Sequence, residues 1–128
     1  MPLRDTLKIM VVDDTSVSRA LIIQAIEAMG VRSIDHARDG QSALKALAVR
    51  PAHLVVSDHN MPGMTGIDLL RALRSKPATA KTAFILVTGR PDRALIAEGQ
   101  KLGMHNFLPK PFTPKDMKRC IEGVFGPV

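Results

Sequence analysis

The sequence contains no tryptophan, no tyrosine and only one cysteine, Cys120. A single cysteine cannot close an internal disulfide, and it does not supply the spaced ligands of a zinc site. Every apolar run is far shorter than the roughly 20 residues of a transmembrane helix, and residues 1–6 lack the apolar core of a signal peptide. We therefore expect a cytoplasmic protein that does not insert into a membrane.

Aromatic residues make up only 3% of the chain, so few side chains are available to stack on nucleic-acid bases. The net charge is +6, but the basic residues are dispersed and no helix-turn-helix segment is attached. Both observations argue against a nucleic-acid partner. The 128 residues contain no linker or repeat, and their number suits one compact domain. We expect a single domain over residues 1–128, without an output domain.

Short apolar runs alternate with segments of helical spacing along the whole chain. The runs predicted as strands are 7–12, 33–37, 54–57, 83–87 and 106–108. The segments predicted as helices are 15–29, 40–49, 65–74, 91–102 and one that begins after Thr113. Most of the runs are apolar on both faces, which is typical of a parallel sheet covered by helices on both sides. The alternation predicts an α/β doubly wound fold with five parallel strands.

The predicted helices differ in the strength of their signals. Thr113 and Asp116, like Thr65 and Asp68, have the spacing of a capping box at a helix start. The segment 91–102 has a ragged apolar stripe and a glycine inside it. We expect this segment to be the helix that moves most easily.

The stretch HLVVSDHNMPG, residues 53–63, contains a buried-strand pattern that ends in a carboxylate, Asp58. A buried carboxylate without a partner costs several kcal/mol, so a cation should lie nearby. Ligands of parallel α/β sheets bind at the carboxyl ends of the strands, so the residues at the other strand ends are the expected neighbours of Asp58. The other polar residues expected at those ends are Asp13, Asp14, Thr88 and Lys110.

Each of these residues has an ordinary explanation when it is considered alone, such as a helix start, a turn or a solvated lysine. Together they place three carboxylates, a hydroxyl and an amine at one edge of the sheet. Two like charges about 4 Å apart repel by roughly 4 kcal/mol at an effective dielectric constant of 20, so three carboxylates favour a bound cation. Oxygen ligands with positions left for water are typical of Mg²⁺.

Four motifs carry a resemblance to a known family: VVDDTS, SDHNMPGMTG, VTGR and LPKPF, in this order. In combination the chain resembles the receiver domain of response regulators, in its single-domain, chemotaxis-type form, over residues 7–126. The resemblance implies a flavodoxin-like fold with strand order 2-1-3-4-5. It also implies a histidine kinase as phosphoryl donor and a protein target downstream.

The resemblance also implies roles for individual residues. Asp58 matches the phosphorylated aspartate, and Lys110 matches the lysine that contacts the phosphoryl group. Asp13 and Asp14 match the acidic pair at the Mg²⁺ site, in which Asp14, Asp58 and the carbonyl of Asn60 are ligands. The switch residues implied are Thr88 and Phe107, and the bond between Lys110 and Pro111 is expected to be cis. Arg90 and Asn60 match positions that in the family tune the lifetime of the phosphoryl group.

Phosphorylation of this kind would remodel the face formed by the fourth helix, the fifth strand and the fifth helix. Residues 90–119 carry seven basic and three acidic side chains, so an acidic peptide or domain is a candidate partner for that face. A solvated helix surface is the alternative explanation of this charge.

Other functions remain open from the sequence. A phosphate sink or a phosphorelay shuttle would have the same residues as a switch with its own target. A Mg²⁺-dependent phosphohydrolase is a more distant alternative, because the dehalogenase-type enzymes require an Asp-x-Asp-x-Thr pattern where this chain has Asp13-Asp14-Thr15-Ser16.

Overall fold

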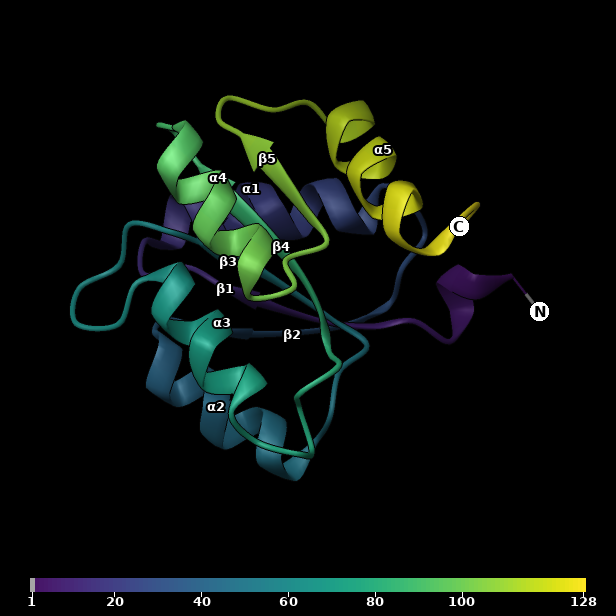
Figure 1. Cartoon of the computed structure of the whole chain (residues 1–128). Coiled ribbons are helices and arrows are strands. Elements are labelled where there is room, and N and C mark those ends of the chain that lie inside the picture. The colour runs from purple at the N-terminus through teal and green to yellow at the C-terminus, as the bar shows by residue number, and fades with distance from the viewer. Residues whose placement is uncertain (1) are drawn as a thin grey trace.

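The apolar runs of the sequence lie side by side as one parallel sheet, and the segments between them form helices (Figure 1). The computed structural model describes residues 2–128. Its strands are β1 (Lys8–Val12), β2 (Ser33–Ala37), β3 (Leu54–Asp58), β4 (Ala83–Thr88) and β5 (Asn106–Pro109). Its helices are η1 (Leu3–Asp5), α1 (Ser16–Glu27), α2 (Gly40–Val49), α3 (Gly66–Arg74), α4 (Arg93–Lys101) and α5 (Pro114–Phe125). The strand order is β2-β1-β3-β4-β5, as the resemblance implied.

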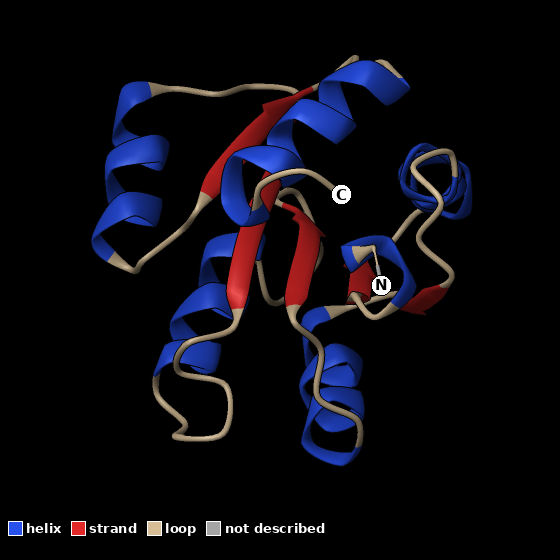
Figure 2. Cartoon of the chain, turned by 90° about the vertical axis from the view of Figure 1, so that its right-hand side faces the viewer, coloured by secondary structure: helices blue, strands red, loops and turns tan. Residues whose placement is uncertain are grey.

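Helices cover both faces of the sheet, which confirms the doubly wound prediction (Figure 2). On one face, α1 and α5 pack against the sheet through residues such as Ile26 and Ile121. On the other face, α2, α3 and α4 cover a second apolar cluster that includes Leu47 and Leu70. Burial of one such side chain stabilises the fold by about 1.5–3 kcal/mol, so the two clusters hold the strand ends firmly in place.

The strands differ in how far the helices cover them. Every residue of β3 and β4 is buried, which matches the expectation of strands that are apolar on both faces. The exceptions are β2, in which only Ala37 is buried, and β5, in which only Leu108 is buried. These two strands lie at the edges of the sheet, where β2 pairs with β1 alone and β5 pairs with β4 alone.

Capping boxes begin two helices at the residues predicted for them. The Thr65 hydroxyl accepts a hydrogen bond from the Asp68 backbone N–H at 3.2 Å, and the Asp68 carboxylate accepts one from the Thr65 N–H at 3.0 Å. Thr113 and Asp116 make the same pair of bonds at the start of α5, at 3.1 and 2.8 Å. The N–H donors favour the ionised acids, and they lower the pKa of Asp68 and of Asp116.

Helix α4 is held less firmly than its neighbours, in line with its weak sequence pattern. Gly99 is its only buried residue. A Cβ at Gly99 would lie 2.7 Å from the sulfur of Met104, so the glycine inside this helix makes room for that side chain. No helix among residues 2–128 is both long and apolar enough to cross a bilayer.

Candidate functional site

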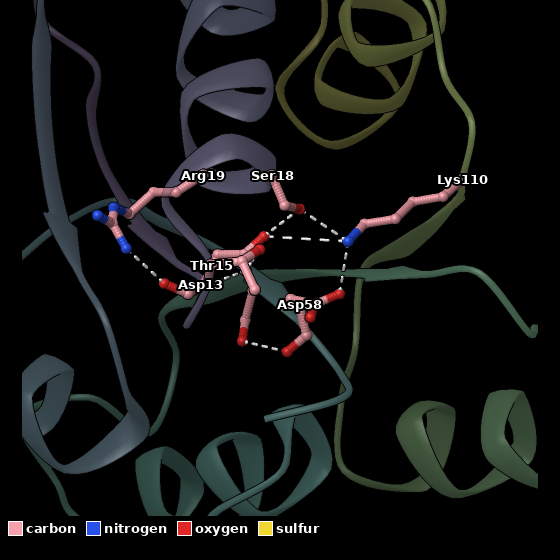
Figure 3. A network of polar contacts seen from close by, with 7 residues as sticks. Asp13, Thr15, Ser18, Arg19, Asp58 and Lys110 are labelled. Carbon is pink, nitrogen blue, oxygen red and sulfur yellow. Dashed lines mark hydrogen bonds and ion pairs between the residues drawn. The ribbon is translucent and has the colours of Figure 1, made fainter. Parts of the chain in front are cut away.

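Three strand ends bring Asp13, Asp58 and Lys110 together at one edge of the sheet (Figure 3). Asp13 directly follows β1, Asp58 is the last residue of β3, and Lys110 directly follows β5. Asp58 pairs in register with Val87 of β4, so the strand ladder continues one residue beyond the predicted end of this strand. Both aspartates are buried. The geometry therefore unites residues that are far apart in the chain.

Lys110 supplies the cation that the buried Asp58 carboxylate requires. Its Nζ atom lies 3.0 Å from Asp58 Oδ1 and 3.9 Å from Asp13 Oδ2. The same nitrogen donates a hydrogen bond to the hydroxyl of Ser18 at 2.8 Å. The peptide bond between Lys110 and Pro111 is cis, the isomer that the resemblance implied.

The carboxylate of Asp13 is fixed by the first turn of α1 and the residue before it. Its Oδ1 atom accepts hydrogen bonds from the backbone N–H of Thr15 at 3.0 Å and from the Thr15 hydroxyl at 3.2 Å. Its Oδ2 atom accepts a short hydrogen bond from the hydroxyl of Ser18. The guanidinium of Arg19 donates to the backbone carbonyl of Asp13 at 2.9 Å. Four donors thus hold Asp13 in one orientation.

The three aspartates form a compact acidic cluster. One carboxylate oxygen from each of Asp13, Asp14 and Asp58 lies within 4.8 Å of the others, and Asp14 is the exposed member. Burial raises the pKa of Asp58, and the positive charge of Lys110 only partly opposes this effect. Because one lysine faces three acids, the cluster retains an excess of negative charge. Its oxygen donors fit a hard divalent cation.

The remaining predicted site residues lie around the cluster. Asn60 is exposed in the loop that follows β3. Thr88 is buried at the end of β4, and its hydroxyl accepts a hydrogen bond from the backbone N–H of Arg90 at 3.1 Å. Phe107 of β5 is half-buried, and it packs against the apolar cluster beneath α3 and α4. The Thr88 hydroxyl is therefore hydrogen-bonded to the loop that follows β4.

Sequence reasoning did not identify Ser18 or Arg19 as parts of the site. Nothing in the sequence pattern distinguished Ser18 from the other hydroxyl residues at the start of this helix, Thr15 and Ser16. The contact of Ser18 with Lys110 joins residues 92 positions apart. The packing of α1 beside α5 creates that contact.

A groove between α1 and the start of α5 opens beside the cluster. It has a volume of about 620 Å³, and its walls are mostly apolar. Val17 and Leu21 lie along it and are among the most exposed large apolar side chains of the described residues. Ser18 and Lys110 line the end of the groove that meets the acidic cluster. A partner placed in this groove would touch the site.

Comparison with known proteins assigns the arrangement to a family. The sequence matches the response regulator receiver domain over residues 9–122. This chain belongs to the response regulator receiver family. It is 44% identical over 126 residues to a probable chemotaxis protein CheY of Rhizobium etli, and the match covers 98% of each chain. The receiver is thus a CheY-like response regulator, which is a phosphoacceptor signalling protein rather than a conventional enzyme.

Solved receiver structures have the same fold. Chemotaxis protein CheY4 of Vibrio cholerae is 27% identical, with a TM-score of 0.86 and coverage of 92% of this chain and 98% of that one. The receiver domain of sensor histidine kinase PA1611 of Pseudomonas aeruginosa is 21% identical, with a TM-score of 0.83 and coverage of 94% and 98%. That structure has a magnesium ion coordinated in its active site cleft.

Proposed function

We propose that Asp58 is the residue of this receiver that accepts a phosphoryl group from a histidine kinase. The observation that carries the proposal is the ion pair between Asp58 and Lys110 at 3.0 Å, inside an acidic cluster of a receiver-family protein. An oxygen of Asp58 would bond to phosphorus as the P–N bond of the donor's phosphohistidine breaks, and the bonding electron pair would leave with the imidazole. The product is an acyl phosphate.

The residues present fit a magnesium ion, and the fit rests on three carboxylate oxygens within 4.8 Å of one another. We propose Asp13, Asp14 and Asp58, with the backbone carbonyl of Asn60, as the groups that hold it. When bound, Mg²⁺ neutralises charge on the phosphoryl oxygens. The magnesium in the related P. aeruginosa receiver supports this assignment.

Lys110 supplies the positive charge that phosphoryl transfer to Asp58 would need. Phosphoryl transfer has a loose transition state, so catalysis consists mostly of positioning and charge stabilisation. The Lys110 amine, which now pairs with Asp58, lies where it can donate to a phosphoryl oxygen. The burial of Asp58 strengthens that interaction relative to bulk water, and the Lys110 side chain is itself only partly exposed.

We propose that Thr88 and Phe107 transmit the phosphorylation of Asp58 to the α4-β5-α5 face. The acyl phosphate offers new acceptor oxygens, and the Thr88 hydroxyl, which now accepts a hydrogen bond from the Arg90 N–H, would swing toward one of them to donate its own proton. This movement would vacate space for the ring of Phe107. Phosphorylation then shifts an existing equilibrium between two arrangements of the face. The weakly buried α4 is the element most able to respond.

An acidic protein segment is the partner that the charges of this face suggest. The acids of the region are already engaged, because Asp92 caps α4, Asp116 caps α5 and Glu98 pairs with Arg71 of α3 at 2.8 Å. The exposed bases that remain are Arg90, Arg93, Lys101, Lys115, Lys118 and Arg119. Apart from Lys110, no base from 90 to 119 forms an ion pair within residues 2–128.

We also propose that this protein acts in the cytoplasm, in chemotaxis. The match to the R. etli protein supports this, since it covers nearly all of both chains.

Intact-mass measurement after incubation with Mg²⁺ and acetyl phosphate tests the central step. The wild-type protein should gain the mass of one phosphoryl group, and Asp58→Asn should gain none. Asp35→Asn, which removes an exposed carboxylate of β2, is the matched control and should behave as wild type. A phosphoryl group on the Asp58→Asn protein would place the acceptor elsewhere and overturn the proposal.

A further inference from the structure

The hydroxyl of Ser18 connects Lys110 to Asp13. Ser18 lies in the first turn of α1, donates its proton to Asp13 Oδ2 and accepts a hydrogen bond from Lys110 Nζ at 2.8 Å (Figure 3). Lys110 Nζ and Asp13 Oδ2 are 3.9 Å apart, which is too far for a direct hydrogen bond. Ser18 therefore makes the link that these two charged groups do not make themselves.

The two neighbours of Ser18 fix the direction of its hydroxyl. An ammonium group only donates and a carboxylate only accepts, so the single proton of Ser18 must point to Asp13 and its lone pairs to Lys110. Thr15 already supplies two donors to the other oxygen of Asp13. Loss of the Ser18 hydroxyl would leave Asp13 held by Thr15, whereas Lys110 would keep only Asp58 as a hydrogen-bond acceptor.

Lys110 needs a second acceptor because its amine sits on a flexible four-carbon stem. Asp58 cannot serve as a constant anchor, since its carboxylate is the group that reacts in the proposed function. Ser18 takes no part in the bond changes, and the helix that carries it packs against the sheet. We propose that Ser18 is a positioning residue that holds the Lys110 amine beside Asp58 for phosphoryl transfer. This inference rests on the proposed role of Asp58.

Phosphorylation rates with acetyl phosphate at saturating Mg²⁺, followed by intact mass, test the inference in the full chain. Ser18→Ala should react about tenfold more slowly than wild type, because it removes a hydrogen bond to a charged group that is needed in the transition state. Ser18→Thr keeps the hydroxyl, and its methyl group has room in the adjoining groove, so it should restore most of the rate. Ser16→Ala, an exposed serine of the same helix turn, should leave the rate unchanged.

A double-mutant cycle separates positioning of Lys110 from a general effect on the site. Lys110→Ala should be slow, and Ser18→Ala in that background should cause no further loss. A second fall in rate would show that Ser18 acts through another group, and it would overturn the inference. Circular dichroism of each variant would show whether the fold is intact, and the Ser18→Thr rate supplies the comparison if Ser18→Ala is unfolded.

The outcomes distinguish this inference from the proposed function. If wild type is phosphorylated on Asp58 and Ser18→Ala reacts at the wild-type rate, only the role of Ser18 fails. If wild type is not phosphorylated, the proposed function fails and the role of Ser18 fails with it. A slow Ser18→Thr variant with an intact fold would also contradict the inference, because the hydroxyl is still present.

Discussion

Replacement of Asp58 by asparagine should stabilise the metal-free protein, although Asp58 is central to the site. Burial raises the pKa of this carboxyl group, so folding disfavours its ionised form. Asparagine has nearly the same size and no charge. The substitution should therefore relieve a destabilising charge without leaving a cavity.

The magnitude follows from the distances in the cluster. Asp58 faces two like charges, Asp13 and Asp14, whose carboxylate oxygens lie within 4.8 Å, and at that limit each repels by about 3.5 kcal/mol at an effective dielectric constant of 20. Lys110 at 3.0 Å attracts the Asp58 charge by about 5.5 kcal/mol on the same scale. The exposure of Asp14 weakens one repulsion, whereas the burial of Asp58 adds a cost of its own. We expect a net stabilisation of about 1–2 kcal/mol.

Urea or thermal unfolding in EDTA at neutral pH measures this difference. Circular dichroism is the suitable signal, because the chain has no tryptophan or tyrosine for fluorescence. The midpoint temperature of Asp58→Asn should be about 3–8 °C higher than that of wild type. Asp35→Asn makes the same change in net charge at an exposed site 4.0 Å from Arg50, and it should shift the midpoint little.

The pH dependence gives a second test with a defined sign. The folded-state pKa of Asp58 is raised, so its contribution to stability is fully present below the unfolded-state pKa and is lost as the pH rises through the folded-state value. The advantage of Asp58→Asn should therefore grow with pH and vanish in acid. Mg²⁺ should stabilise wild type more than the variant, because the variant lacks a ligand. A variant that is less stable than wild type in EDTA would refute the reasoning.

Two further predictions concern positions outside the acidic cluster. Gly66→Ala should destabilise the fold by about 1–3 kcal/mol in urea unfolding, because the added Cβ would lie 2.7 Å from the Asp58 carbonyl oxygen, whereas Gly89→Ala has open space and should be nearly neutral. His105 Nδ1 accepts the Phe84 N–H at 3.1 Å, and burial lowers its pKa from 6.5. The stability that neutral His105 contributes is present above pH 6.5 and is lost as the pH falls. Wild type should therefore lose more stability in mild acid than His105→Asn does. Equal losses in the two proteins would contradict this prediction.

The strands and helices were largely predictable because apolar spacing decides which segments are buried. The predicted ends of β3 and β4 are each one residue short of the observed ends, because the ladder continues through Asp58 and Thr88. Polar residues at the end of a buried strand interrupt the apolar sequence pattern, although the strand itself continues through them. The turn η1 has only three residues and left no pattern to detect.

The site was predictable in part, and the limit is set by tertiary packing. The strand-end rule groups Asp13, Asp58 and Lys110 from a linear sequence, because parallel strands end at one edge of the sheet. No such rule places a helix residue such as Ser18, whose contact with Lys110 depends on how α1 packs beside α5. The strand order itself came from the resemblance, since apolar runs do not specify which of them are neighbours.

The clustering of three carboxylates around one lysine suits the proposed phosphoryl transfer, but its net negative charge also destabilises the fold. With three carboxylates and one amine, the cluster has a net charge near −2, which a single divalent cation would balance. A phosphoryl group on Asp58 adds roughly −1.5 to −2 and replaces a carboxylate, so negative charge again exceeds positive charge. The excess negative charge would need additional hydrogen-bond donors from the surrounding residues. Thr88 is a suitable donor, because among residues 2–128 its buried hydroxyl is hydrogen-bonded only to the backbone N–H of Arg90. In the function proposed above, charge imbalance at Asp58 is thus the physical reason that phosphorylation there would move the α4-β5-α5 face.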